Sequence, residues 1–259
     1  MNLKIIGLNL GYITNLFHAE NTLQQNFDKG RISVCSPTWV ILGGDKKILI
    51  ETGYPSVDWF MNHIPKSLSG SFWQRAERKP EQELNPALAK INLKPEDFDI
   101  VINTHLHFDH CGQNNAFKNA KFIVQREEYI NAFRPFTGFE WAYASPLAFP
   151  GEMPPFWGTK FTFIEGDTEI IDGVKCITIP GHSPGEHGVL VKTKKGQYFI
   201  SGDLFPTYEN WEKKIPTGYI SNLDDWYKSY DKVESLDATV ISHHDALNFK
   251  KDDDIVEFG

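Results

Sequence analysis

The chain has 259 residues and a formal net charge of −8, with 41% hydrophobic and 23% charged residues. This length suits one large domain or two small ones with a sizeable buried core, and the composition excludes a disordered chain. The acidic balance excludes the basic surface of a protein that tracks phosphates, so we expect no nucleic-acid partner. Three scattered cysteines without metal or redox spacing indicate free thiols in a reducing compartment.

The N-terminal stretch "MNLKIIGLNLGYITNLF" is typical of a first strand rather than of a signal peptide. Asparagines interrupt its apolar residues, and no small-residue cleavage site follows. No apolar run in the chain approaches the roughly 20 residues needed to span a bilayer. We therefore expect a cytoplasmic protein without a membrane partner.

The first part of the chain predicts antiparallel sheet. The runs "TWVILGG" and "KKILIETG" are joined by a Gly-Gly-Asp turn that indicates a hairpin. The run "NPALAKINL" predicts a helix, capped by Asn85 with Pro86 in its first turn and ending before Pro95. "FDIVINT" is β-rich with little polarity, which predicts a central strand covered on both faces. "AKFIVQ" predicts another strand, and "REEYINAF" a short helix.

An insert rich in aromatic residues, prolines and glycines spans about residues 131–163 and fits neither a helix nor a strand pattern. Its side chains could form a satellite core under a long loop. Loops this long in compact domains are usually functional, however, and an aromatic wall would give an apolar substrate a place to bind. The candidate pocket residues are Phe133, Phe136, Phe139, Trp141, Tyr143, Phe149, Phe156 and Trp157.

Strands return after the insert. The runs "FTFIEG", "TEIIDG", "VKCITIPG", "HGVLVKT" and "GQYFISGD" are separated by short turns of glycine and aspartate. "NLDDWYKSYDKVESL" has an asparagine cap and helical spacing, and "ATVISHHD" predicts the final strand. We expect an α/β protein whose 259 residues form one domain, with strands inside and helices outside in two halves around the insert.

Metal-binding side chains follow the predicted central strand within the run "VINTHLHFDHCGQNN". His105 and His107, two residues apart on a loop that leaves a strand, can grip one cation, while Asp109 and His110 point to a neighbouring position. A lone His-x-His would be weak evidence for a metal site, since such histidines are often ordinary polar residues on the protein surface. Three further candidates follow other strands: His182, Asp203 and one histidine of the pair His243 and His244.

Seven such ligands are too many for one tetrahedral ion. They suit two ions about 3.5 to 4 Å apart, bridged by a carboxylate and a water-derived hydroxide. Histidine and carboxylate together favour zinc, with iron, manganese or cobalt also possible. The sequence therefore predicts a dinuclear site for two divalent transition-metal ions.

The motifs "HLHFDH", "PGHSPG", "SGD" and a late "HD", in this order, resemble the metallo-β-lactamase superfamily over nearly the whole chain. Within it, "VINTHLHFDHCGQNNAF" and "HDALNFK" are most similar to the bacterial lactonases, both N-acyl-homoserine lactonases and 4-pyridoxolactonase. The resemblance implies an αβ/βα sandwich of two mixed sheets with helices outside and the metals at one edge. It also implies a small-molecule substrate, opened by attack of a hydroxide that bridges the metals.

The family pattern assigns each candidate a position. It gives His105, His107 and His182 to the first metal, Asp109, His110 and His244 to the second, and Asp203 to both. His244 is chosen over His243 because the last ligand of the family directly precedes an aspartate, here Asp245. His243 is then expected to have a supporting role. Asp109, close to the hydroxide and to the leaving oxygen, is the expected proton shuttle.

Three positions depart from the family pattern. Glu51 stands where the family has the aspartate of Asp-Thr-Gly, so the support of the metal loop could be rearranged. Glu186 replaces a histidine that many relatives have after "PGHSPG", with His187 one residue further on. Pro206 replaces the tyrosine of homoserine lactonases, and the nearest tyrosine, Tyr208, is a candidate to orient the substrate carbonyl.

Two other functional hypotheses compete with the hypothesis of a lactonase. The same site could act on a phosphotriester, a thioester or a β-lactam, although the missing signal peptide counts against a secreted antibiotic-destroying enzyme and the acidic charge against a nuclease. A metal-binding protein that has lost catalysis is the second alternative. The complete set of seven ligand candidates argues against it.

Overall fold

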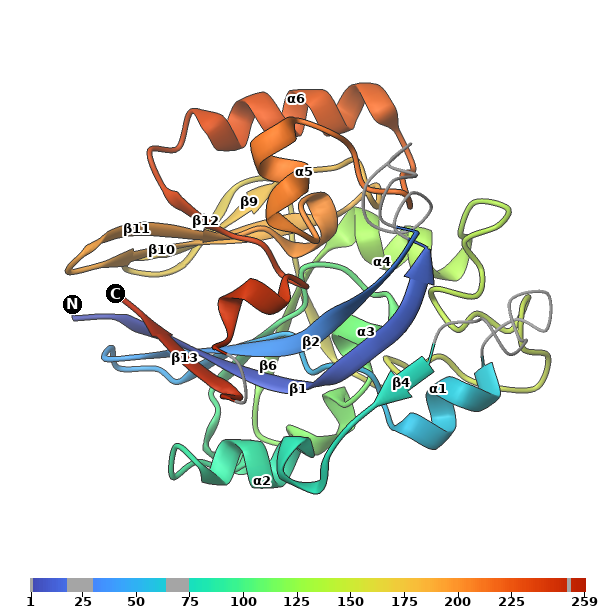
Figure 1. Cartoon of the computed structure of the whole chain (residues 1–259), viewed down its shortest axis with the longest axis horizontal. Helices are drawn as coiled ribbons and strands as arrows, with labels where there is room; N and C mark the ends of the chain where they lie inside the picture. The colour runs from blue at the N-terminus through green and yellow to red at the C-terminus, as the bar shows by residue number, and fades with distance from the viewer. Residues whose placement is uncertain (1, 18–29, 64–74, 251–252) are drawn as a thin grey trace.

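Two β-sheets face each other, and helices cover their outer faces (Figure 1). The computed structural model describes residues 2–17, 30–63, 75–250 and 253–259. Helices α2 and α6 lie on opposite outer sides of the molecule in Figure 1. The expected αβ/βα sandwich of two mixed sheets is confirmed.

The first sheet has the strand order β13-β1-β2-β3-β5-β6-β7, with β4 paired to β1. Its strands are β1 (Lys4–Phe17), β2 (Arg31–Leu42), β3 (Ile48–Ile50), β4 (Arg75–Glu77), β5 (Ile100–Ile102), β6 (Lys121–Gln125), β7 (Phe161–Ile164) and β13 (Ile255–Phe258). The predicted hairpin is confirmed, because β2 and β3 pair antiparallel with Trp39 opposite Ile50. The predicted central strand is β5, which is buried along its length between β3 and β6 and parallel to both.

The second sheet has the order β12-β11-β10-β9-β8. Its strands are β8 (Thr168–Ile171), β9 (Val174–Thr178), β10 (His187–Thr193), β11 (Gly196–Ile200) and β12 (Thr239–Ile241). Strands β11 and β12 run parallel, and the other neighbours run antiparallel. Trp39 and Ile50 of the first sheet share one buried cluster with Val189 and Ile200 of the second, so the main core lies between the sheets.

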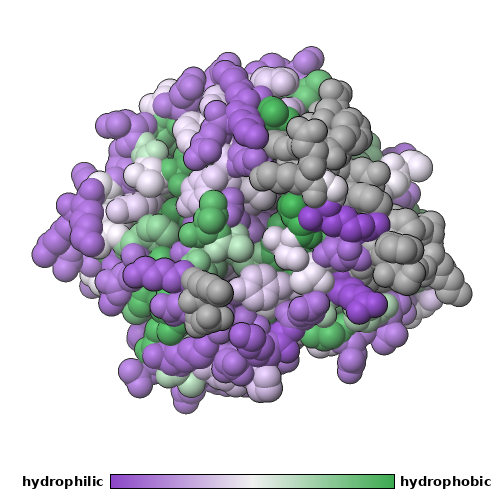
Figure 2. Space-filling model, in the orientation of Figure 1, coloured by the Kyte–Doolittle hydropathy of each residue, from purple (hydrophilic) through white to green (hydrophobic). Residues whose placement is uncertain are grey.

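Six α-helices occur in the described residues: α1 (Val57–His63), α2 (Leu84–Ala89), α3 (Phe108–Cys111), α4 (Arg126–Phe133), α5 (Tyr208–Lys213) and α6 (Leu223–Glu234). Leu84 and Leu88 of α2 pack on the outer face of the first sheet, and Trp226 and Val233 of α6 on that of the second. None of the described helices is long and apolar enough to cross a membrane. On the face shown in Figure 2, hydrophilic residues predominate, as expected when apolar side chains fill the layers.

Two local predictions were wrong. The helix α2 begins at Leu84 with Glu83 as its cap, so Asn85 lies inside the first turn. A 3₁₀ turn over Pro80–Gln82 precedes α2 directly, and the helix begins before Asn85 instead of after it. The strand β12 is also not the last one, because β13 follows it and pairs with β1, with Ile5 opposite Phe258. The two chain ends therefore lie close together (Figure 1).

The cap of α6 generates a stability prediction. The Asn222 side chain accepts a hydrogen bond of 3.0 Å from the backbone N–H of Asp225. Because this bond satisfies an amide that has no partner within the helix, Asn222→Ala should lower the free energy of unfolding by about 1 kcal/mol, measured by urea denaturation. Lys228→Ala is the control, since its ion pair with Asp225 is exposed and should contribute less than about 0.5 kcal/mol. Equal effects of the two changes would contradict the assigned cap.

Candidate metal centre

The predicted ligands come from four loops that follow strands. His105, His107, Asp109 and His110 follow β5, and the last two of these lie on the short helix α3. His182 lies between β9 and β10, Asp203 follows β11, and His243 and His244 follow β12. Strands β3, β5 and β6 run parallel, as do β11 and β12, so their carboxyl ends meet at one edge of the sandwich.

Three buried imidazoles form the first group of donors. His107 Nδ1 lies 3.0 Å from His105 Nε2 and 3.0 Å from His182 Nε2. Donor atoms of these three residues all lie within 4.8 Å of one another. Such a triangle of ring nitrogens has the size of a metal-binding site.

The rings of His105 and His182 each also have a nitrogen that faces away from the group, and the hydrogen bonds of these nitrogens decide where the protons are. His182 Nδ1 lies 2.7 Å from the carbonyl oxygen of Tyr219, which can only accept, so Nδ1 holds the proton and Nε2 has a lone pair. The hydroxyl of Thr104 donates to the carboxylate of Glu51 and therefore accepts from His105 Nδ1 at 3.1 Å. His105 Nε2 then also has a lone pair. Two lone pairs that converge on His107 Nδ1 fit a cation better than a hydrogen-bond network.

A second group of donors lies beside the first. His244 Nδ1 donates to the carbonyl oxygen of Cys35 at 2.6 Å, so Nε2 is the nitrogen with which the neutral ring can coordinate a cation. This Nε2 lies 3.2 Å from His110 Nε2 and 3.1 Å from Asp203 Oδ1. Asp109 Oδ2 completes the group at 3.8 Å from His244 Nε2 and 3.9 Å from His110 Nε2. Two nitrogens and two carboxylates thus face one point.

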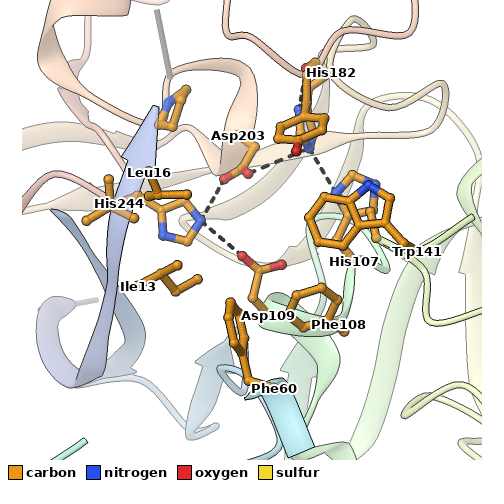
Figure 3. Close-up of a pocket in the computed structure, with 14 residues that line it drawn as sticks. Ile13, Leu16, Phe60, His107, Phe108, Asp109, Trp141, His182, Asp203 and His244 are labelled. Atoms are coloured by element: carbon orange, nitrogen blue, oxygen red, sulfur yellow. Dashed lines mark hydrogen bonds and ion pairs between the residues drawn. The ribbon is translucent and has the colours of Figure 1, made fainter. Parts of the chain in front are cut away.

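Asp203 lies between the two groups (Figure 3). Its Oδ1 faces His244 and His110, at 3.1 and 3.4 Å, and its Oδ2 lies 3.6 Å from His182 Nε2. A carboxylate that offers one oxygen to each group is what two neighbouring ions share. The donors therefore fit two metal ions with Asp203 common to both.

The electrostatics of the two groups differ. Burial, reinforced by neighbouring imidazoles, holds the pKa of His105 and of His107 well below the usual value, so both rings are neutral and able to coordinate. Burial also opposes the protonation of His110, but the carboxylates of Asp203, Asp109 and Glu51 raise its pKa well above the usual value. The second group thus has an excess of negative charge, which favours a bound cation.

A buried carboxylate behind the ligands ties two of their loops together. Glu128 of α4 accepts hydrogen bonds from the Leu106 N–H at 3.0 Å and, in the loop of His182, from the Ser183 hydroxyl at 2.7 Å and the Gly185 N–H at 3.3 Å. Tyr143 of the insert donates a fourth, of 3.0 Å. Burial raises the pKa of Glu128, although all four donors favour its ionised form. Nothing in the sequence of α4 distinguishes Glu128 from the exposed Glu127.

An apolar pocket opens over the metal ligands (Figure 3). Its floor contains His107, Asp109, His182, Asp203 and His244. Its walls are made by Ile13, Leu16, Val34, Phe60, Phe108, Trp141, Ala142, Pro206 and Tyr219. The floor is polar and the walls are largely apolar, which suits a substrate with one reactive polar group and an apolar substituent.

Of the eight aromatic residues predicted for this pocket, Trp141 alone is among its described lining residues. Phe133, Phe136 and Trp157 are exposed instead. Tyr143 and Phe156 belong to a satellite core with Leu106 and Val124, against which Phe139 also packs, and Phe149 packs against His63 and a cluster beside α1. The insert therefore acts mainly as the satellite core that was the alternative reading.

A sequence model described as the metallo-beta-lactamase superfamily matches residues 35–243, which is most of the chain. The chain belongs to the metallo-β-lactamase superfamily. Among members of the superfamily, it is similar to an N-acyl homoserine lactonase of Bacillus cereus, with 32% identity over 194 residues that cover 72% of each protein.

Solved structures of this superfamily share the fold. A variant of AiiA from Bacillus thuringiensis, with N-decanoyl-L-homoserine bound at its active site, superposes with a TM-score of 0.76 at 23% identity, and 95% of each chain is covered. AidC, a dizinc quorum-quenching lactonase, superposes with a TM-score of 0.68 at 17% identity, covering 94% of this chain and 88% of its own. These likenesses show that the chain has the superfamily fold.

The departure from the superfamily pattern at Glu51 leaves the metal loop supported. Glu51 Oε1 accepts the backbone N–H of Thr104 at 3.0 Å and lies 3.4 Å from His110 Nδ1. The Asn103 amide reaches the other oxygen, Oε2, at 3.5 Å. One carboxylate thus contacts both the candidate ligand His110 and the peptide that precedes His105.

The geometry gives Tyr208 no role in substrate binding. Its hydroxyl donates to Asn248 Oδ1 at 2.7 Å, and Tyr208 is not among the described residues that line the pocket. Burial, helped by the charge of Asp245, raises the pKa of Tyr208 to about 12. The hydroxyl thus contacts the turn after β12, and the tyrosine among the described lining residues of the pocket is Tyr219.

His243 lies next to the second group but is oriented as a hydrogen-bond acceptor toward the core. The Trp39 indole N–H donates to His243 Nδ1 at 3.0 Å. Since His243 is buried and burial holds its pKa well below the usual value, its ring is neutral and its one proton is on Nε2. A protonated Nε2 cannot coordinate, although donor atoms of His243 lie within 4.8 Å of those of His110 and His244.

This difference between adjacent histidines is testable by metal content. The fully loaded protein should hold close to two transition-metal ions per chain, because the donors described above form two groups that share Asp203. His244→Ala should lose about one ion by elemental analysis, since it removes a coordinating lone pair. His243→Ala should keep nearly all the metal. At most one ion in the unaltered protein, or equal losses in both variants, would contradict the assignment.

Proposed function

We propose that this protein is a metal-dependent hydrolase that opens a lactone ring, with an N-acyl-homoserine lactone as its substrate. The observation that carries the proposal is the pair of donor groups that share Asp203 at the floor of an apolar pocket. The lactonase relative from Bacillus cereus, at 32% identity, supports the reaction class. Such an activity would make the protein a quorum-quenching enzyme.

The ligand assignment is supported by the distances between the donor atoms. His105, His107 and His182 would hold one ion, and His110, His244 and Asp109 the other. Asp203 would serve both. Zinc suits this mixture of imidazole and carboxylate, and iron, manganese or cobalt could occupy the same donors. Two such ions, when bound, supply a hydroxide nucleophile at neutral pH and polarise the substrate carbonyl.

Asp109 is the residue of this chain best placed to move a proton. Its carboxylate lines the pocket beside Asp203 and His244 and keeps partial contact with solvent. It can therefore accept the proton of the nucleophile when the carbonyl is attacked. Returning that proton to the ring oxygen neutralises the leaving alkoxide, which stays tethered to the opened substrate.

The pocket walls orient the substrate and exclude water from the reacting carbonyl. Ile13 and Leu16 of β1, Phe60 of α1 and Phe108 of α3 offer apolar surface to an acyl chain. Trp141 and the phenol of Tyr219 are the described wall residues that can donate a hydrogen bond. A lactone with an apolar acyl group and an amide suits this combination better than a bare ring.

We also propose that the chain works as a single domain in the cytoplasm. The core between the sheets draws on residues from Leu3 to Ile241, which favours one folding unit. Cys35, Cys111 and Cys176 are all free and buried, as expected in a reducing compartment.

The proton-transfer role of Asp109 can be tested by Asp109→Asn. The amide cannot accept the proton and removes one charge from the second donor group, so turnover of a lactone should fall by roughly 10²-fold or more. The measurement is acid release in a pH-stat, with metal content determined on the same sample. Asp45→Asn, in an exposed turn, is the matched control and should leave turnover unchanged. Near-normal turnover of Asp109→Asn with a full metal complement would reject the role.

The apolar walls predict a dependence on chain length. If the acyl chain is buried against them, each added methylene contributes up to about 0.8 kcal/mol, so kcat/KM should rise by up to roughly fourfold per methylene until the pocket is filled. Acid release from unsubstituted and acylated homoserine lactones measures this. A flat series would show that the walls do not bind the chain. Clear turnover of a phosphotriester or thioester without ring opening would instead assign the site to another ester-like substrate.

A further inference from the structure

Glu186 is a fully buried carboxylate behind the metal ligands, just before β10. Its Oε1 accepts the backbone N–H of Asp203 at 2.5 Å and that of Leu204 at 3.0 Å. These two amides belong to the short 3₁₀ turn over Gly202–Leu204, whose first N–H groups have no partner within the turn. A side chain from another part of the sequence thus caps the turn that carries Asp203.

The fit between this carboxylate and the turn is close. Gly202 has a φ of +54°, which a glycine adopts without strain. A Cβ atom at Gly202 would lie 2.6 Å from Glu186 Oε1 and 3.0 Å from Thr104 Oγ1. The backbone of the turn therefore packs directly on the carboxylate and cannot shift toward it.

The orientation of Asp203 depends on this contact. Its two carboxylate oxygens must face different donor groups, with Oδ1 toward His244 and Oδ2 toward His182. A short side chain has few rotamers, so its direction is set by the peptide that carries it. Glu186 accepts the N–H of that peptide and the N–H of the next one, so it restrains the direction of both peptides.

The residue type at position 186 decides how many backbone N–H groups of the turn its side chain can accept. One carboxylate oxygen has two lone pairs and can accept both amides, whereas a neutral imidazole offers one acceptor nitrogen. Glu186 can therefore hold the N–H groups of Asp203 and Leu204 with one oxygen, which a histidine at this position could not do.

We infer that Glu186 is a positioning residue that fixes Asp203 in the orientation in which it serves both metal ions. The inference rests on the proposed dinuclear function. Because one oxygen of Glu186 makes both contacts, the amide oxygen of glutamine can replace it. Alanine leaves the two N–H groups without an acceptor and frees the turn to move.

The experiment uses the full chain, freed of metal and titrated with Co²⁺ alone. Calorimetry gives the affinity of each ion, and electron paramagnetic resonance reports the magnetic coupling of two ions across a shared carboxylate. Glu186→Ala should bind its second Co²⁺ at least tenfold more weakly and lose the coupling. Glu186→Gln should keep both properties within about threefold of the unaltered protein.

Two controls separate positioning from general loss of stability. Glu127→Gln changes an exposed glutamate and should alter nothing, and Val191→Ala weakens the core between the sheets without touching a ligand loop. The inference is overturned if Glu186→Ala keeps two coupled ions of unchanged affinity, if Glu186→Gln is as impaired as Glu186→Ala, or if Val191→Ala loses the coupling as well. An unaltered protein that binds only one Co²⁺ would instead refute the dinuclear function.

Discussion

The site depends on protons that are fixed on the outer nitrogens of buried imidazoles. His182 donates to the carbonyl of Tyr219, His244 to that of Cys35, and His105 to the hydroxyl of Thr104. Each of these bonds leaves the inner nitrogen with a lone pair that faces the same small volume. His105 Nε2 and His182 Nε2 each lie 3.0 Å from His107 Nδ1, and acceptors that converge in this way suit a cation. The carbonyl groups and the Thr104 hydroxyl that fix these tautomers thus favour a metal ion at the site.

Three buried carboxylates hold the ligand loops from behind. Glu51 accepts the N–H of Thr104, Glu128 that of Leu106, and Glu186 that of Asp203. The three carboxylates come from different parts of the chain, and each accepts a main-chain N–H within one residue of a candidate ligand or at the candidate ligand itself. Buried carboxyl groups are costly unless they are paired with donors or cations, and here the loops of the candidate ligands supply backbone donors. The loops and the carboxylates therefore stabilise one another.

The sequence predicted which candidate donors lie close together much better than it predicted the pocket. His105, His107, Asp109 and His110 lie within six residues after a buried strand, so their proximity is a local property. The strand pattern likewise predicted most of both sheets, because alternation and turns are local as well. The pocket walls combine β1, β2, α1 and the segment at Tyr219, which lie far apart in the chain. No local pattern reveals that Ile13 and Phe60 meet over the same floor.

Three further features could not be predicted from the sequence. Tyr208 was chosen because it is the tyrosine nearest to Pro206, yet the start of α5 turns its hydroxyl toward Asn248. Nothing in the sequence distinguishes Glu128 from Glu127, and only the helical phase of α4 directs the Glu128 side chain toward the loops of the candidate ligands. The strand β13 follows a charged stretch and is recognisable mainly by its pairing with β1.

The bond from His244 to Cys35 has a consequence for the whole molecule. Cys35 lies on β2 of the first sheet, while His244 follows β12 of the second, so this ligand spans the two layers. His105 follows β5 of the first sheet, and Asp203 follows β11 of the second. Ions held by these residues would link the two layers, and their binding free energy would add to the stability of the fold. A chelator would then do more than abolish activity, because it would also remove the links between the two sheets at one edge of the sandwich.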